Sequence, residues 1–239
     1  MGKTLIVIPT FNERENVNPL LNRIFSLKIL VDVLILDDNS PDGTKNIVLE
    51  NKKKYKKRLH LISRKKKNGL GRAYIQGFRW ALERKYEKII QMDADLSHPP
   101  EKLTNIINEL DFYDYVIGSR YINGIRVLNW PLNRILLSIC ASWYVKLITG
   151  LPVKDSTAGF VGYNRSTLLS LNLDDIMFVG YAFQIEMKFK LWKLGYKFIE
   201  IPITFKNRTR GESKMNSSII SEAIYGVIII KFKSLFKND

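Results

Sequence analysis

Cysteine and histidine are scarce in this chain of 239 residues. Cys140 is the only cysteine, and there are only two histidines. One cysteine excludes a disulfide within the chain and argues against a metal site built on thiolates. Such a sequence suits a reducing compartment, where disulfides do not persist.

Long hydrophobic runs are also missing. No stretch of 18 uncharged apolar residues occurs, so we expect no helix that spans a membrane. The apolar residues Thr4 to Ile8 are too few for a signal peptide, and Pro9 follows at once.

The usual glycine-rich phosphate loops are absent as well. Gly69-Leu70-Gly71 begins like the dinucleotide motif G-x-G-x-x-G, but Tyr74 stands where its last glycine should be. No G-x-x-x-x-G-K-[ST] loop occurs anywhere in the chain. If this protein binds phosphates, it must hold them in another way.

Positive charge is in clear excess. Lysine and arginine number 38 against 23 acidic residues, which gives a net charge of +15. The excess favours a polyanionic partner: the phosphates of a small molecule, a nucleic acid or an anionic membrane. The basic runs 52–58 and 64–67 are more typical of a solvated helix end and loop than of a lipid-binding patch. No recognised nucleic-acid motif is present.

Short apolar runs alternate with amphipathic segments along the first half of the chain. We expect strands at residues 4–8, 31–36, 59–62, 88–92 and 115–118, with helices between them. Strands and helices that alternate over short connections predict an α/β fold with an open, mostly parallel sheet. Ligands bind such sheets outside the carboxyl ends of the strands.

Three polar stretches follow these strands, and the most informative is Asp93-Ala94-Asp95. Two carboxylates at the end of a buried strand need a positive partner, because an unpaired buried charge is costly. Oxygen ligands of this kind suit Mg²⁺ or Mn²⁺, which also coordinate substrate phosphates. The alternative is that Asp93 and Asp95 cap the helix that follows near Pro99. The stretches 9–13 and 37–40 would line the same crevice.

Several motifs together resemble one protein family. Pro-Thr-Phe-Asn-Glu at 9–13, Asp-Asp-Asn-Ser at 37–40 and Asp-Ala-Asp at 93–95 are followed by further matches at 118–121, 183–187 and 210–214. They look like the dolichyl-phosphate (polyprenyl-phosphate) mannosyltransferase branch of glycosyltransferase family 2. The resemblance implies a GT-A fold and transfer of mannose from GDP-mannose to a polyprenyl or dolichyl phosphate. It also implies inversion at the sugar and dependence on Mg²⁺ or Mn²⁺.

The resemblance assigns site residues by position. Asp93 and Asp95 would bind the metal. From the chemistry, we expect Asp95 to be the direct ligand and Asp93 to be shared between the metal and the donor. The catalytic residues would be Asp95, Arg120, Arg208 and Lys214. The nucleotide-sugar would contact Pro9, Phe11, Glu13, Leu36, Asp38, Asp93, Ala94, Arg120, Arg208 and Lys214.

Two positions depart from the family pattern. Phe11 stands where the family usually has tyrosine, so a hydroxyl contact is lost while ring packing remains. Ser97 stands where some members have glutamine near the metal, which leaves the number of protein ligands open.

The acceptor explains the lack of an obvious catalytic base. A phosphate monoester has a second pKa near ~6, so it is largely ionised at neutral pH. We therefore expect structural roles for His60 and His98. Cations must hold the two anionic substrates together, and the loop 207–216, with three cations, is expected to close over them.

Two further stretches are expected to face a membrane. Within 130–150, the residues Arg134, Ser138, Ser142 and Lys146 form a narrow polar stripe on an otherwise apolar helix. We expect Arg120, Arg134 and Ser138 to guide the lipid phosphate; the alternative is a fully buried core helix. Residues 1–216 would form the catalytic domain, and 217–239 an apolar and basic helix that faces the membrane or a small membrane-protein partner. This places the protein peripherally on the cytoplasmic face of a membrane.

Three other functions stay open. The same fold could transfer a glucosyl or related group from a UDP-sugar to the same acceptor. The charge of +15 allows a nucleic-acid-binding protein, although we expect no nucleic-acid partner. A non-catalytic subunit is disfavoured because the clustered carboxylates are intact.

Overall fold

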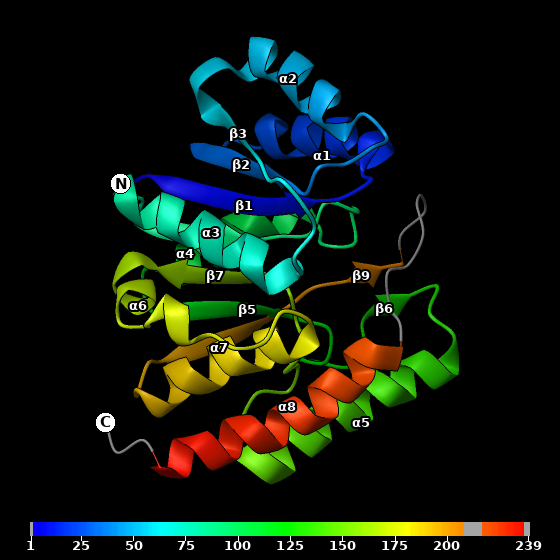
Figure 1. Cartoon of the computed structure of the whole chain (residues 1–239), viewed down its shortest axis with the longest axis vertical. Coiled ribbons are helices and arrows are strands. Elements are labelled where there is room, and N and C mark those ends of the chain that lie inside the picture. Colours follow the sequence, from blue (N-terminus) through cyan, green and yellow to red (C-terminus); the bar gives the residue numbers. More distant parts are fainter. Residues whose placement is uncertain (1, 208–216, 237–239) are drawn as a thin grey trace.

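A mixed sheet of seven strands forms the centre of the molecule in the computed structural model (Figure 1). The structure describes residues 2–207 and 217–236, with side chains from residue 222 onward in the second range. In spatial order the strands are β3 (Leu59–Ser63), β2 (Val31–Asp37), β1 (Thr4–Thr10), β4 (Lys88–Gln91), β7 (Val161–Asn164), β5 (Tyr115–Ser119) and β8 (Phe198–Pro202).

Five of these strands were expected from the sequence, and all five are present. β7 is antiparallel to both of its neighbours, whereas the other pairings in the sheet are parallel. The expected α/β class and the mostly parallel sheet are therefore confirmed. A second sheet pairs β6 (Val127–Leu128) with β9 (Phe205–Lys206).

Helices cover both faces of the main sheet. They are α1 (Arg14–Ser26), α2 (Thr44–Tyr55), α3 (Leu70–Glu83), α4 (Leu103–Glu109), α5 (Leu132–Thr149), α6 (Arg165–Leu169), α7 (Tyr181–Lys193) and α8 (Ser217–Phe236). Short 3₁₀ turns lie at Lys56–Arg58, Pro100–Lys102 and Leu173–Asp175.

The alternation of side chains along β1 explains the two hydrophobic layers. Leu5 and Val7 belong to a core with α3 and α7, whereas Ile6 and Ile8 belong to a core with α1 and α4. Successive residues of a strand point to opposite faces, so a fully apolar strand has to be covered twice. This double burial fixes the strand ends, and hence the loops that carry the polar motifs.

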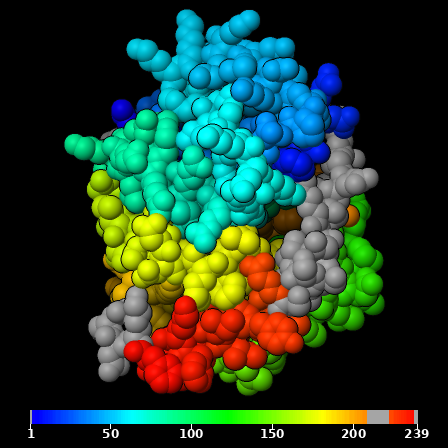
Figure 2. Space-filling model, in the orientation of Figure 1, coloured from blue at the N-terminus to red at the C-terminus, as the bar shows by residue number. Residues whose placement is uncertain are grey.

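Helices α5 and α8 lie side by side at one end of the molecule (Figure 1). Val145 of α5 and Val227 and Ile230 of α8 join the hydrophobic core, while the Tyr144 hydroxyl donates to the carbonyl of Ile224 over 3.0 Å. In the space-filling view these two helices, green and red, form the lower end of the protein (Figure 2).

The outer sides of these two helices are apolar and exposed. On α5, Leu147 is 83 % exposed and Trp143 is 74 % exposed. The exposed apolar residues of both helices are Leu132, Leu136, Leu137, Trp143, Leu147, Ile224, Tyr225, Ile228, Ile229, Phe232, Leu235 and Phe236. The alternative that 130–150 is a fully buried core helix is therefore wrong. Among the described residues, no helix combines the length and the apolarity needed to cross a membrane.

Candidate active site

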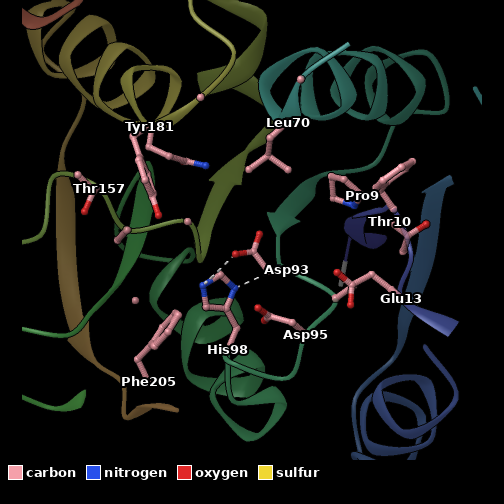
Figure 3. Close-up of a pocket in the computed structure, with 18 of the residues that line it drawn as sticks. Pro9, Thr10, Glu13, Leu70, Asp93, Asp95, His98, Thr157, Tyr181 and Phe205 are labelled. Atoms are coloured by element: carbon pink, nitrogen blue, oxygen red, sulfur yellow. Dashed lines mark hydrogen bonds and ion pairs between the residues drawn. The ribbon is translucent and has the colours of Figure 1, made fainter. Parts of the chain in front are cut away.

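A pocket of about 360 Å³ opens at the carboxyl ends of β1 and β4. Figure 3 shows Asp93 and Asp95 at its centre, with Pro9, Thr10 and Glu13 on one side and Tyr181, Thr157 and Phe205 on the other. The structure brings together many of the residues expected from the sequence: Pro9, Phe11, Glu13, Asp38, Asp93, Ala94, Asp95, Arg120 and Arg134.

The turn after β1 is fixed by the acidic turn after β2. The Asp42 carboxylate accepts hydrogen bonds from the Arg14 amide (3.0 Å) and from the Thr44 amide and hydroxyl. The Ser40 hydroxyl accepts from the Asn12 amide over 3.0 Å. These side chains replace the regular sheet partners that the backbone loses where the strands end. The two loops thus form one rigid wall of the pocket.

Adjacent aspartates on β2 and its turn have different roles. Asp37 is 1 % exposed and accepts from Thr10 and Ser40, so it holds the turn together. Asp38 lines the pocket and pairs with Arg64 at 2.5 Å. Burial raises the pKa of Asp38, although the Arg64 guanidinium opposes the shift. Lys67 and Phe11 line the same pocket, and the Lys67 ammonium lies 4.5 Å from the centre of the Phe11 ring.

Two buried side chains orient Asp93. The Tyr74 hydroxyl donates to Asp93 Oδ1 over 3.0 Å, and burial raises the pKa of Tyr74 well above its usual value, so the phenol stays protonated. His98 Nδ1 accepts from the Asp93 amide over 3.0 Å, and His98 Nε2 lies 3.8 Å from Asp93 Oδ2 (Figure 3). His98 is also stacked on Phe160. The structural role expected for His98 is thus to position the Asp93 carboxylate.

The two aspartates fit a divalent cation that is shared with a substrate. Asp95 Oδ1 accepts from the Ser97 amide over 3.1 Å, and both carboxylates are only half-buried. Within the described residues, no three His, Cys, Asp or Glu side chains form a metal cluster by themselves. Mg²⁺ is typically bound by one or two carboxylates, with substrate phosphates and water completing the shell. Asp93 and Asp95 provide such a partial set.

Arg120 is paired with a buried acid. Its Nε and Nη2 atoms donate to Asp155 over 2.7 and 2.5 Å, and Nη2 also donates to Thr157 over 2.8 Å. Burial alone would lower the pKa of Arg120, but the Asp155 carboxylate outweighs it and the pKa is raised. The pKa of Asp155 is lowered because Arg120 outweighs the effect of burial. Arg120 therefore reaches the pocket with its charge largely balanced.

Aromatic rings and a second arginine form the far end of the pocket. The Arg134 guanidinium lies 3.9 Å from the centre of the Trp130 ring, and its Nη1 donates to Asn207 over 3.2 Å. Phe205 packs edge-on against Trp130. The small β6–β9 sheet brings these segments together, although they are far apart in the chain. This end of the pocket combines cations with aromatic rings, a combination that suits a phosphate attached to an apolar chain.

Two carboxylates hold the loop that precedes α7. Glu186 of α7 accepts from the amides of Met177 and Phe178 over 3.0 to 3.2 Å. Glu222 of α8 accepts from the amides of Val179 and Gly180, each over 3.1 Å, and lines the pocket. Helix α8 therefore contributes to the pocket wall.

Some expected site residues lie elsewhere. The Leu36 side chain is 0 % exposed in the core and does not line the pocket, because β2 is covered on both faces. Ser138 lies one turn beyond Arg134 and is not a lining residue either. The residues of the polar stripe on α5 lie in different environments. Ser142 is buried against Ser156, whereas Lys146 is exposed. Arg208, Lys214 and most of the loop 207–216 lie outside the described residues.

The structure also adds pocket residues that the sequence did not single out. They include Lys67, Thr157, Tyr181, Gln184 and Glu222. Gln184 lies in one of the motifs that carry the family resemblance, which was the available signal for it. Glu222 offered no signal, because its partners are the amides of a loop more than 40 residues away.

Solved structures of a glucosyl-transfer enzyme share this fold. Glucosyl-3-phosphoglycerate synthase from Mycobacterium tuberculosis in complex with phosphoglyceric acid superimposes with a TM-score of 0.72, covering 97% of this chain and 80% of that one. The same enzyme in complex with Mn²⁺, UDP and glucosyl-3-phosphoglycerate gives a TM-score of 0.68, covering 100% of this chain and 81% of that one. Sequence identity is 15% in both cases, so this likeness establishes the expected GT-A fold alone.

Closer relatives are found by sequence. Residues 5–170 match the model of Glycosyl transferase family 2. The undecaprenyl-phosphate mannosyltransferase of Micrococcus luteus is 42% identical, covering 94% of this chain and 92% of its own. The polyprenol monophosphomannose synthase of Mycolicibacterium smegmatis is 41% identical, covering 94% and 85%. The dolichol-phosphate mannosyltransferase of Pyrococcus furiosus is 35% identical, covering 92% and 61%. The chain is an enzyme of glycosyltransferase family 2 and belongs to the branch of the polyprenyl-phosphate mannosyltransferases.

Proposed function

We propose that this enzyme transfers mannose from GDP-mannose to a polyprenyl phosphate, with inversion at the sugar and with Mg²⁺ or Mn²⁺. The product would be a β-linked polyprenyl-phosphate mannose, a lipid-linked donor for glycosylation. Relatives of about this length carry names for that acceptor and that sugar, at 41% and 42% identity.

One observation carries the proposal: a single pocket joins the acidic pair to the Trp130–Arg134 end. The acidic pair suits a metal-bound diphosphate, and the cationic, aromatic end suits the phosphate of a lipid. The chemistry requires both substrates in one cavity, because proximity supplies much of the rate enhancement in group transfer.

The reaction balances as a single displacement. An oxygen of the acceptor phosphate forms a bond to C1 of mannose, and the bond from C1 to the diphosphate oxygen breaks, so that GDP leaves with the electron pair. When bound, a divalent cation would supply Lewis-acid stabilisation of the diphosphate leaving group. Asp93 and Asp95 would hold that cation, while Tyr74 and His98 keep Asp93 in place.

No protein base is required at the acceptor. The phosphate is already ionised near neutral pH, and His98 Nδ1 is occupied by the Asp93 amide. The roles proposed for Arg120 and Arg134 are to attract and orient the phosphates, together with Arg208 and Lys214 from the undescribed segment. Because Asp155 balances the charge of Arg120, the proposed role of Arg120 is to orient a phosphate more than to attract it.

The exposed apolar sides of α5 and α8 support a peripheral position on a membrane. Trp143 and Leu147 would enter the interface, and Lys146, Lys231 and Lys233 would lie near anionic headgroups. We place this surface on the cytoplasmic face, where nucleotide-sugars are available. A small membrane protein is the other partner that such a surface could accept.

The test is transfer with defined substrates. Purified enzyme is incubated with GDP-mannose or UDP-glucose and with polyprenyl phosphate in vesicles, with Mg²⁺, Mn²⁺ or EDTA. We expect metal-dependent mannosyl lipid from GDP-mannose, with a β anomeric signal by NMR. Preferential transfer from UDP-glucose would support the UDP-sugar alternative, and an α-linked product would contradict inversion.

A further inference from the structure

A buried chain of three polar side chains runs from the core to the pocket. It consists of Tyr163 on β7, Gln91 on β4 and Gln184 on α7. Tyr163 and Gln91 are 0 % exposed, and Gln184 is 3 % exposed but lines the pocket. Buried polar groups are costly unless they are paired, so such a chain needs an explanation.

One backbone carbonyl fixes the direction of every hydrogen bond in this chain. The Gly159 carbonyl can only accept, so the Gln91 atom 2.9 Å from it must be the amide nitrogen. Gln91 Oε1 therefore lies on the other side, where it accepts from the Tyr163 hydroxyl over 3.1 Å. Burial raises the pKa of Tyr163, which keeps this hydroxyl a donor.

The same reasoning extends to Gln184. The second hydrogen of the Gln91 nitrogen points to Gln184 Oε1 over 2.6 Å. Because Gln184 Oε1 faces Gln91, Gln184 Nε2 must point the other way. Among the described residues it donates to no acceptor. The usual ambiguity between the oxygen and nitrogen of an amide is thus removed by the network.

The Gln184 nitrogen lies beside the metal-binding carboxylate. A methyl group placed on Gly159 would be 3.7 Å from Gln184 Nε2 and 3.7 Å from Asp93 Oδ2. Both atoms therefore border the same small region of the pocket floor, which the missing side chain of Gly159 leaves open. Asp93 Oδ1 is already bonded to Tyr74 on its other side.

We propose that Gln184 Nε2 donates a hydrogen bond to an oxygen of the bound nucleotide-sugar next to Asp93. Gln91 is a positioning residue that keeps the donor pointing into the pocket. A neutral donor suits this place, because it binds an oxygen without competing with the metal for Asp93. This inference rests on the proposed function, since it assigns a contact within the donor site.

The test compares three variants of the same network. Gln184→Met removes the donor with little change in volume, and we expect kcat/KM for the sugar nucleotide to fall about tenfold or more. Gln91→Met leaves Gln184 in place but releases its orientation, so a fall of about threefold to tenfold is expected. Tyr163→Phe is the matched control: it breaks a buried hydrogen bond, but the Gly159 carbonyl still directs Gln91, so kinetics should stay within about twofold.

The kinetic constant that changes distinguishes a contact with the substrate from a purely structural role. The losses should fall on the kinetics of the sugar nucleotide, with KM for polyprenyl phosphate unchanged. Donor kinetics within about twofold of wild type in Gln184→Met would overturn the proposal, as would a loss confined to the acceptor KM. Equal losses in all three variants would also overturn it, because they would track stability alone.

Failure of the proposed function would be seen separately. If wild-type enzyme makes no mannosyl lipid, the donor is identified from the sugar nucleotide that raises the melting temperature most with Mn²⁺. The three variants are then compared by affinity for that compound. Weaker binding by Gln184→Met and Gln91→Met, but not by Tyr163→Phe, would still support the contact, and unchanged binding would overturn it.

Discussion

The pocket has two sides, which we call the donor side, next to α1 and α2, and the acceptor side, next to α5 and α8. They differ in how much apolar surface these helices expose. On the donor side, the apolar side chains of α1 pack into the core, and α2 leaves only Leu49 exposed among its large apolar residues. On the acceptor side, α5 and α8 expose large apolar side chains along their length. This difference fits our proposal that one side faces water, where a soluble donor enters, and that the other faces a membrane, which holds a lipid acceptor.

We expect the buried ion pair on the acceptor side to contribute strongly to the stability of the fold. Asp155→Leu leaves Arg120 buried without its partner, so we expect a loss of about 3–5 kcal/mol in the free energy of unfolding. Urea unfolding measures the change. The double variant Arg120→Met/Asp155→Leu should regain most of this stability, because both charges are gone. A loss below about 1 kcal/mol in the single variant would mean that this side does not depend on the pair.

The donor side is tested by the acidic pair. Asp95→Asn keeps the shape of the side chain but removes a charge from the metal site, and we expect transfer to fall at least about 100-fold. The metal-dependent rise in melting temperature with GDP should disappear as well. Asp111→Asn is the control, because this carboxylate pairs with Lys88 at the start of β4, away from the pocket. Equal activity in both variants would contradict the assigned metal site.

Two leucines with nearly equal exposure, only one of which lies on the acceptor side, test whether that side binds membranes. Leu147 of α5 is 83 % exposed, and Leu30 near the start of β2 is 84 % exposed. Burial of a leucine in a membrane interface is worth about 1.5–3 kcal/mol at most, so Leu147→Ser should weaken binding to anionic vesicles about tenfold. Leu30→Ser should leave vesicle binding unchanged, as measured by co-sedimentation. Equal effects would remove the distinction between the two surfaces.

A separate effect is expected on the pH dependence of stability. Lys188 is fully buried on α7, and its ammonium donates to the carbonyls of Ser156, Ala158 and Gln184. Burial lowers its pKa from 10.5 to about 7, against the nearby Asp155 and Glu200 carboxylates. The unfolded chain therefore binds more protons between these values, and the free energy of unfolding rises with pH across that range.

Lys188→Met should remove that rise. The slope of the unfolding free energy against pH should differ from wild type by at most about 1.4 kcal/mol per pH unit between pH 7 and 10. Denaturant unfolding at a series of pH values measures it. Parallel curves for the two proteins would show that Lys188 keeps an ordinary pKa in the fold.

The sequence predicted the donor side better than the acceptor side, for a physical reason. The strands β1 and β4 belong to a mostly parallel sheet that is buried on both faces, and such strands give continuous apolar runs that are easy to recognise. The polar residues that follow them, such as Glu13 and Asp93, then fall at one edge of the sheet. The sequence pattern did not show that the strand of Leu36 continues to Asp37, which keeps the Leu36 side chain in the core.

On the acceptor side, the decisive contacts join segments that are distant in sequence. β7 and β8 were not expected, because β7 is short and carries polar and small residues. The pairing of Arg120 with Asp155 arises only when the residue that follows β5 is brought beside the loop that holds Asp155. The link from Gln91 to Gln184, which belongs to the donor site, likewise arises only when β4 and α7 are brought together. A pattern along the chain contains no signal for partners of this kind.

The Glu222 carboxylate has a consequence for how this enzyme can be re-engineered. It lies on the helix that carries much of the exposed apolar surface, and it also holds the amides of Val179 and Gly180 at the pocket. The helix is therefore not interchangeable with any other apolar helix. A chimaera that replaces α8 with another amphipathic helix should stay active only if it keeps a glutamate at position 222 in the same register.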